Sequence, residues 1–202
     1  MTGCRHFHPF VAIIFLFLTA LAACAQSTNR PAKWARPVSL PGIHNFYQVT
    51  TNLYRGAQPT AEGMAGLQGM GIKTVINLRA LHSDTGKVTG TRLKSVRFGM
   101  RPWHGETTDV VAFLKVAMDT NNLPVFVHCQ RGADRTGTMC AMYRIVVCGW
   151  SKEEAIDELK NGGYDFNPVW QTLIHYIEQV DINDIKRRVA LPEKKTGWWH
   201  WF

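Results

Sequence analysis

The segment His128–Thr136 reads HCQRGADRT and carries more structural information than any other part of the chain. A short apolar run, Pro124–Val127, precedes it, and a long apolar run, Gly137–Cys148, follows it. The first run is typical of a buried strand and the second of a central, buried helix. In a strand–loop–helix unit, the N–H groups of the loop gather at the positive end of the helix dipole. The segment therefore predicts an anion-binding loop.

Two side chains of this loop suggest phosphate chemistry. Cys129 precedes Arg135 by six positions, and Gly132 lies between them and allows a tight bend. A helix N-terminus and nearby cations favour the thiolate form of a cysteine, which is a nucleophile that can attack phosphorus in line. Arginine supplies a planar fork that binds two phosphate oxygens. We therefore predict that Cys129 and Arg135 are catalytic.

The other residues of the loop have expected supporting roles. The residues expected to bind the substrate phosphate are Gln130, Arg131, Gly132, Ala133, Asp134 and Arg135. His128 is expected to hold the shape of the loop through its ring N–H, and Thr136 to donate its hydroxyl to the departing sulfur. Asp134 has two interpretations: it favours phosphotyrosine or another modestly charged monoester, or it holds a neighbouring loop by hydrogen bonds.

The loop motif, with His128, Cys129, Gly132, Arg135 and Thr136 followed by glycine, resembles the signature of the protein-tyrosine phosphatase superfamily. A single compact domain resembles its dual-specificity branch. The stretches that resemble the atypical dual-specificity phosphatases of plants and fungi and the exported bacterial enzymes are residues 52–55, 58–59, 73–79, 142–147 and 149–150. The resemblance implies a two-step phosphatase that needs no metal and no cofactor, acting on a phosphorylated protein or a small phosphomonoester.

The resemblance also implies a general acid, usually an aspartate, on a loop upstream of the nucleophile. The corresponding segment is residues 102–109, PWHGETTD, and its most family-like position holds Glu106. A glutamate performs the same proton transfer if it reaches the leaving group. We predict Glu106 as the catalytic acid, with Asp109 and His104 as alternatives.

Strands and helices are expected to alternate along the chain. The expected strands are residues 53–55, 74–78, 95–100 and 124–127, and the expected helices are 60–70, 109–118, 137–148, one opened by a capping box at Ser151 and Glu154, and 168–180. This order predicts an α/β fold, a single compact cysteine-phosphatase domain with a largely parallel central sheet flanked by helices. Cys140 and Cys148 are expected to be small buried residues of one helix. No Cys/His spacing suggests a zinc site.

The ends of the chain differ from the middle. Residues 1–24 are predicted to be a signal peptide of lipoprotein type, because an apolar run ends in LAAC at Cys24. The alternative is ordinary cleavage after Ala25. Residues 25–45 are expected to be a linker, 46–185 the phosphatase domain and 186–202 a basic, aromatic tail. We thus expect an exported protein facing a bacterial periplasm, attached to the membrane through lipidated Cys24 or, in the alternative, soluble in the periplasm.

Composition limits the possible partners. The chain has 202 residues, 46% of them hydrophobic, and a formal charge of +8, which suits a folded domain with an anionic partner. The basic residues are scattered and no nucleic-acid motif is present, so we expect no nucleic-acid partner and a monomer. The leading function is a protein-tyrosine or dual-specificity phosphatase. The alternatives are an inositol phosphate or phosphoinositide phosphatase, a catalytically silent phosphate-binding module, and another cysteine-loop enzyme such as a sulfurtransferase or arsenate reductase.

Overall fold

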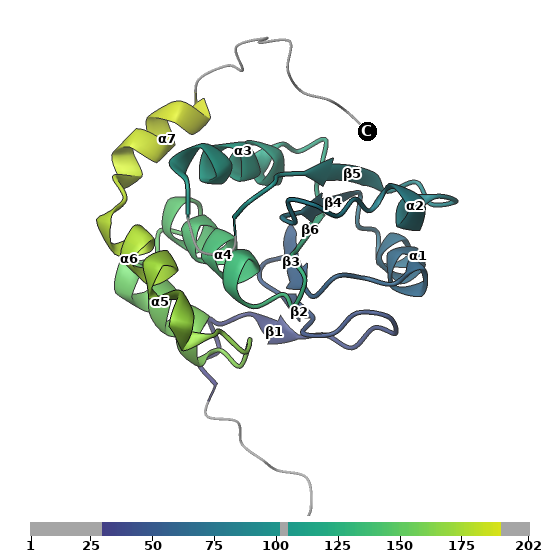
Figure 1. Ribbon diagram of the computed structural model, residues 1–202, viewed down its shortest axis with the longest axis horizontal. Helices are drawn as coiled ribbons and strands as arrows, with labels where there is room; N and C mark the ends of the chain where they lie inside the picture. Colours follow the sequence, from purple (N-terminus) through teal and green to yellow (C-terminus); the bar gives the residue numbers. More distant parts are fainter. Residues whose placement is uncertain (1–29, 102–104, 191–202) are drawn as a thin grey trace, which may run out of the picture. The chain divides into compact units, whose positions relative to one another are not determined.

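The computed structural model describes residues 30–101 and 105–190, and the compact unit begins at Ala32 (Figure 1). The predicted signal peptide with Cys24, the alternative acid His104 and the aromatic end of the tail lie outside the described residues. The elements, in chain order, are β1 (Arg36–Pro37), β2 (Tyr47–Gln48), β3 (Leu53–Gly56), α1 (Ala61–Gly69), β4 (Thr74–Asn77), α2 (Thr85–Val88), β5 (Lys94–Arg97), α3 (Thr107–Met118), β6 (Val125–His128), α4 (Asp134–Val146), α5 (Lys152–Asn161), a 3₁₀ helix (Pro168–Trp170), α6 (Gln171–Gln179) and α7 (Ile182–Ala190).

The strands form one sheet in the order β1-β2-β3-β6-β4-β5. The pairs β3–β6, β6–β4 and β4–β5 are parallel, and β1 and β2 extend the sheet antiparallel at one edge. Every residue of β4 and β6 is buried. Continuous apolar strands of this kind belong in the centre of a parallel sheet that is covered on both faces. The predicted α/β fold with a largely parallel sheet is confirmed.

Helices cover both faces of the sheet (Figure 1). On one face, Met64 and Leu67 of α1 pack in a cluster with Val75 and Phe126. On the other face, the long helices α3 to α7 contribute to the larger core cluster, which includes Ile76 and Val127 from the same strands. Alternate residues of each strand thus face opposite layers. Helix α4 follows directly from the loop after β6, so its N-terminus lies at the carboxyl edge of the central strands.

Local sequence signals explain where several helices begin. The Thr60 hydroxyl accepts the Gly63 N–H at 3.2 Å at the start of α1. Both hydrogen bonds of the predicted capping box between Ser151 and Glu154 are present at the start of α5. These reciprocal bonds satisfy N–H groups that a helix cannot pair internally. Helix α3, expected from residue 109, begins at Thr107 and is preceded by Glu106, so Thr108 lies within its first turn.

The domain starts earlier and ends later than the predicted boundaries at residues 46 and 185. Trp34 and Ala35, placed in the expected linker, are buried, and the Ala35 N–H donates to Glu158 at 2.6 Å. At the other end, α7 runs to Ala190, and its Ile185 is fully buried. These buried residues lie among polar and basic residues in the sequence, so no apolar pattern marked them as part of the domain.

The cysteine prediction is half right. Cys140 is buried within α4, as expected. Cys148 is exposed, because α4 ends at Val146 and the chain turns toward Gly149, which adopts a positive φ of 72°. Within residues 30–101 and 105–190, no helix is long and apolar enough to cross a membrane.

Candidate active site

The loop between β6 and α4 bends at Gly132, whose φ is +73°. A Cβ atom at this position would lie 2.3 Å from the Gly56 carbonyl carbon and 2.5 Å from the Ala57 nitrogen. Only glycine tolerates both this dihedral angle and this close approach. The end of β3 is therefore packed directly against the bend of the loop.

Donors outside the loop hold its carbonyl groups. The Cys129 carbonyl accepts a hydrogen bond from His128 Nδ1 at 3.0 Å. The Gln130 carbonyl accepts the Gln58 N–H at 3.2 Å, and the Arg131 carbonyl accepts Asn45 Nδ2–H at 3.0 Å. In a planar trans peptide, the carbonyl and the following N–H point in opposite directions. Anchoring the carbonyls in this way leaves the N–H groups of the loop on the other side, as an anion cradle requires.

The structure places Cys129 and Arg135 at the two ends of this loop. Cys129 is a free thiol with an exposed fraction of 3%, and Arg135 is half-buried. Arg135 Nη1 donates to the carbonyls of Leu78 and Met100, each at 3.4 Å. These bonds are near the upper limit of length and hold the guanidinium only weakly. Buried Cys140 differs, because burial raises the pKa of its thiol to about 11 and keeps it protonated.

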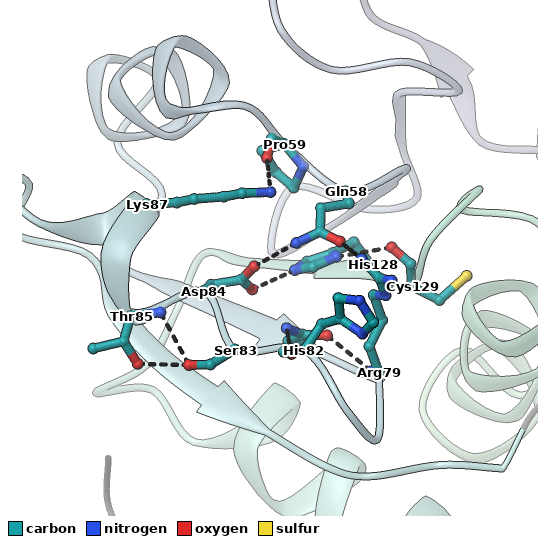
Figure 2. A network of polar contacts seen from close by, with 11 residues as sticks. Gln58, Pro59, Arg79, His82, Ser83, Asp84, Thr85, Lys87, His128 and Cys129 are labelled. Carbon is teal, nitrogen blue, oxygen red and sulfur yellow. Dashed lines mark hydrogen bonds and ion pairs between the residues drawn. The ribbon is translucent and has the colours of Figure 1, made fainter.

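His128 lies beneath the loop and is fully buried. Its Nδ1 contacts the Cys129 carbonyl at 3.0 Å, and its Nε2 contacts Asp84 Oδ2 at 2.7 Å. A carbonyl oxygen only accepts, so Nδ1 carries a proton and donates it, while Nε2 lies within hydrogen-bond distance of the Asp84 carboxylate. Figure 2 shows the Cys129 side chain pointing away from this network. Both ring nitrogens of His128 are thus engaged, one of them by the Cys129 backbone, and the predicted supporting role of His128 fits this geometry.

A chain of polar contacts orients Asp84 (Figure 2). Arg79 donates to Gln58 Oε1, and Gln58 Nε2 donates to Asp84 Oδ1 at 2.9 Å. Burial by itself would raise the pKa of Asp84, but its hydrogen bond with His128, the charges of His128 and Lys87, and the Gln58 contact together hold it below the ordinary value. Asp84 is therefore ionised at neutral pH and holds the His128 ring in place.

Two charged residues of the loop face outward. Arg131 is exposed and forms an ion pair with Asp165. Asp134 Oδ1 accepts the Asn167 N–H at 2.8 Å. Of the two interpretations of Asp134, the structural one is thus present: its carboxylate ties the loop to the segment before the 3₁₀ helix. Its place at the first residue of α4 keeps its own N–H in the anion-binding set.

Thr136 is fully buried, and its hydroxyl has no hydrogen-bond partner among the described residues. A buried hydroxyl without a partner is costly unless a partner arrives during the reaction. This observation agrees with the predicted donation to the departing sulfur.

The candidate acids lie at the start of α3. Glu106 directly precedes the helix and is half-buried, with the Thr108 hydroxyl 3.5 Å from its Oε2. Asp109 lies in the first turn. Burial raises the pKa of Tyr176 on α6, its side-chain hydrogen bond with Thr107 lowers this pKa, and the charge of Asp109 raises it. The Asp109 carboxylate is thus close enough to α6 to act on Tyr176.

Several residues that shape the site have no role assigned from the sequence. Asn45 was placed in the linker, and Asp84 carried no prediction. Arg55, Gln58 and Arg79 lie in stretches that resemble the family, but no pattern in the sequence assigned them a role in the site. A polar residue within an apolar strand, such as Arg55 in β3, was the one signal available. In the described ranges, no group of three metal-binding side chains comes together.

Comparison with known proteins gives consistent results. A family model described as a DSP-PTPase phosphatase fused to NAD⁺ kinase matches residues 42–172. The dual specificity protein phosphatase TpbA of Pseudomonas aeruginosa is 32% identical over 183 residues, which cover 89% of this chain and 81% of TpbA. An inositol diphosphatase of Arabidopsis thaliana is 27% identical over 154 residues, covering 71% of this chain and 73% of the relative.

Solved structures agree in fold. The crystal structure of TpbA superposes with a TM-score of 0.71 and 29% identity, over 80% of this chain and 99% of that chain. A second TpbA structure, in complex with phosphotyrosine, gives a TM-score of 0.71 and 28% identity over 80% and 98% of the two chains.

Proposed function

Because this chain belongs to the dual-specificity branch of the protein-tyrosine phosphatase superfamily and is a phosphatase-like hydrolase, we propose that it cleaves phosphomonoesters through a phosphocysteine on Cys129, with phosphotyrosine as the preferred substrate. The observation that carries the proposal is the loop itself. Its carbonyls are held from outside, its bend requires Gly132, and a nucleophile and an arginine occupy its two ends.

The first step transfers the phosphoryl group to sulfur. The Cys129 thiolate attacks phosphorus, the bond between phosphorus and the leaving oxygen breaks, and the Glu106 carboxylic acid gives its proton to that oxygen. In the second step, water attacks phosphorus, the Glu106 carboxylate takes a proton from the water, and the phosphorus–sulfur bond breaks. Inorganic phosphate and the thiolate are released, and the Thr136 hydroxyl donates to the departing sulfur.

The electrostatics of the site support this mechanism. The His128 ring donates from Nδ1 to the Cys129 carbonyl, and the N-terminus of α4 follows the loop. Both favour negative charge on the sulfur and on the phosphate. Arg135 leaves its two weak carbonyl contacts and binds the phosphate as a fork.

Glu106 is the acid we propose, rather than Asp109. Glu106 directly precedes α3, whereas Asp109 lies in the first turn of that helix, where its charge acts on Tyr176 of α6. Carboxylates are common in the first turn because they interact favourably with the helix dipole, which explains Asp109 without a catalytic role.

The substrate preference rests on charge around the loop. Arg131, the cation that could bind a second phosphate, is paired with Asp165, and Asp134 adds a negative charge beside the site. This arrangement suits a substrate with a single phosphate, and the relative TpbA has been solved in complex with phosphotyrosine. The second candidate is an inositol phosphate, which the named activity of the Arabidopsis relative favours.

Hydrolysis of para-nitrophenyl phosphate by the reduced protein tests the proposal. Cys129→Ser is expected to abolish turnover, because the serine hydroxyl stays protonated at neutral pH. Cys148→Ser, which removes an exposed thiol from the same domain, is the matched control and is expected to keep full activity. Turnover by Cys129→Ser, or no turnover by the wild type with no binding of vanadate, would refute the mechanism.

A substrate panel then decides between the candidates. We expect the highest kcat/KM with phosphotyrosine peptides, compared with phosphoserine and phosphothreonine peptides, phosphoinositides and inositol polyphosphates. A preference of tenfold or more for an inositol polyphosphate would select the second candidate.

We further propose export and lipid attachment at Cys24, on the sequence of the leader alone. Labelling of the wild type with radioactive palmitate in a bacterial host, and loss of the label in Cys24→Ala, is the expected result. A secreted, unlabelled wild-type protein would favour ordinary cleavage after Ala25.

A further inference from the structure

A second arginine lies under the phosphate loop. Arg55 belongs to β3, pairs in register with Val127 of β6 and has an exposed fraction of 2%. Its Nη2 donates to the Gly132 carbonyl at 2.6 Å and to the Ala133 carbonyl at 3.3 Å. Arg55 therefore completes the set of donors that hold the carbonyls from Cys129 to Ala133.

The surroundings of Arg55 are unusual for a buried charge. Its guanidinium carbon lies 3.7 Å from the centre of the Tyr164 ring, and its Nε has no partner in the described part of the chain. The Tyr164 hydroxyl donates to Glu158 at 2.9 Å, which fixes the ring. A buried arginine usually pairs with a carboxylate. Here the guanidinium instead contacts two loop carbonyls and the face of an aromatic ring. Its positive charge therefore lies next to the loop.

Peptide geometry gives this contact a consequence for the cradle. Because the Gly132 and Ala133 carbonyls point toward β3, the N–H groups of the next residues, Ala133 and Asp134, point away from β3. Those two N–H groups stand at the N-terminus of α4, where the dipole favours an anion. If Arg55 were absent, the Gly132 carbonyl would lose its 2.6 Å donor, whereas the Ala133 carbonyl would keep the Gly137 N–H at 2.7 Å.

We propose that Arg55 is a positioning residue for phosphate binding, which orients the loop by its two carbonyl bonds and supplies a buried positive charge below it. This inference rests on the proposed function. Arg55 does not touch the substrate, because the backbone of the loop lies between them: Nη2 bonds the carbonyl side of the peptides whose N–H groups face the anion.

The test uses inorganic phosphate as the probe, with Arg55→Met, Arg55→Lys and a control, Arg144→Met. Arg144 is a second buried arginine, bonded to Glu158 at 2.9 Å through Nε, and it does not contact the loop. Loss of hydrogen bonds to a charged group weakens an interaction by about tenfold to a hundredfold. We therefore expect the inhibition constant of phosphate to rise by about that factor in Arg55→Met and by less in Arg55→Lys, which keeps the charge.

A second readout separates orientation of the cradle from a loss of stability. Iodoacetate is an anion that the cradle attracts to Cys129, and iodoacetamide is neutral. The ratio of their inactivation rates is expected to fall in Arg55→Met and to stay unchanged in Arg144→Met, although the melting temperature of the control falls.

Three results would overturn the inference: phosphate inhibition of Arg55→Met within twofold of the wild type, an unchanged reagent ratio, or the same changes in Arg144→Met. If Arg55→Met does not fold, Arg55→Lys decides by the same two measurements. Failure of the wild type to hydrolyse any phosphomonoester would refute the proposed function instead, and phosphate protection against iodoacetate would still report on Arg55.

Discussion

Replacing Asp84 by asparagine tests the buried network under the catalytic loop. The Asp84 carboxylate accepts from two donors, His128 Nε2 at 2.7 Å and Gln58 Nε2 at 2.9 Å. Asparagine has one acceptor oxygen, so its NH₂ group would face one of these donors. Gln58 cannot turn over to compensate, because Arg79 donates to its Oε1. The substitution therefore removes one hydrogen bond outright and turns a charge-assisted bond into a neutral one.

The expected loss of stability follows from these two changes. Leaving a buried donor unpaired costs about 1–3 kcal/mol, and a bond to a charged group is worth about 1 kcal/mol more than a neutral one. We expect Asp84→Asn to lower the free energy of unfolding by about 2–4 kcal/mol at pH 7.5. At about 2–4 °C per kcal/mol for a domain of this size, the melting temperature should fall by about 4–16 °C.

The pH dependence has a definite sign. The pKa of Asp84 is lowered in the folded protein, so the unfolded chain binds the proton at higher pH. The stabilisation is fully present above the ordinary aspartate pKa of about 3.9 and is lost as the pH falls through the lower folded-state value. The difference between wild type and Asp84→Asn should therefore be largest at neutral pH and shrink below about pH 4.

Thermal unfolding from pH 3 to pH 8 measures this difference. Asp157→Asn is the control, because Asp157 is an exposed carboxylate on α5 whose change is expected to cost less than about 0.5 kcal/mol. The reasoning is refuted if Asp84→Asn melts within 1 °C of the wild type at pH 7.5, or if its deficit is the same at pH 3 as at pH 7.5.

Three further substitutions are informative. Gly132→Ala should destabilise the protein by at least about 1–3 kcal/mol in urea unfolding and abolish vanadate binding, because a Cβ would lie 2.3 Å from the Gly56 carbonyl carbon; near-normal binding would contradict the described bend. Asp134→Ala should lower the melting temperature by about 2–4 °C through loss of the Asn167 contact while phosphate inhibition stays within twofold; strongly altered inhibition would instead indicate a role in binding. Glu106→Gln should reduce kcat on phenyl phosphate by about 10²–10⁴-fold and much less on para-nitrophenyl phosphate, while Asp109→Asn retains activity; the opposite result would make Asp109 the acid.

The parts of the molecule that could be predicted from the sequence are those whose physical cause is local. The loop from Cys129 to Arg135 is contiguous, so its residues and its position between a strand and a helix could be recognised together. The capping box of α5 spans four residues, Ser151 to Glu154, and was predicted from the sequence, and both of its bonds are present.

The parts that escaped prediction depend on contacts between distant residues. Asp84 and His128 are 44 positions apart, Arg55 and Gly132 are 77 apart, and Asn45 and Arg131 are 86 apart. No periodicity or spacing in a single sequence specifies which carboxylate meets a given histidine. The same reason explains the early start of the domain, since the Ala35 N–H donates to Glu158, 123 positions away.

Glu158 links the start of the domain to its buried interior. Its carboxylate accepts the Ala35 N–H at 2.6 Å, the Arg144 Nε–H at 2.9 Å and the Tyr164 hydroxyl at 2.9 Å, and Tyr164 carries the guanidinium of Arg55. A shortened protein that begins at residue 42, where the family match begins, would lack the Ala35 N–H that donates to this carboxylate, and it would lack the buried Trp34. The segment with Trp34 and Ala35 thus belongs to the folded domain, and expression of the isolated domain should keep every residue from Ala32 onward.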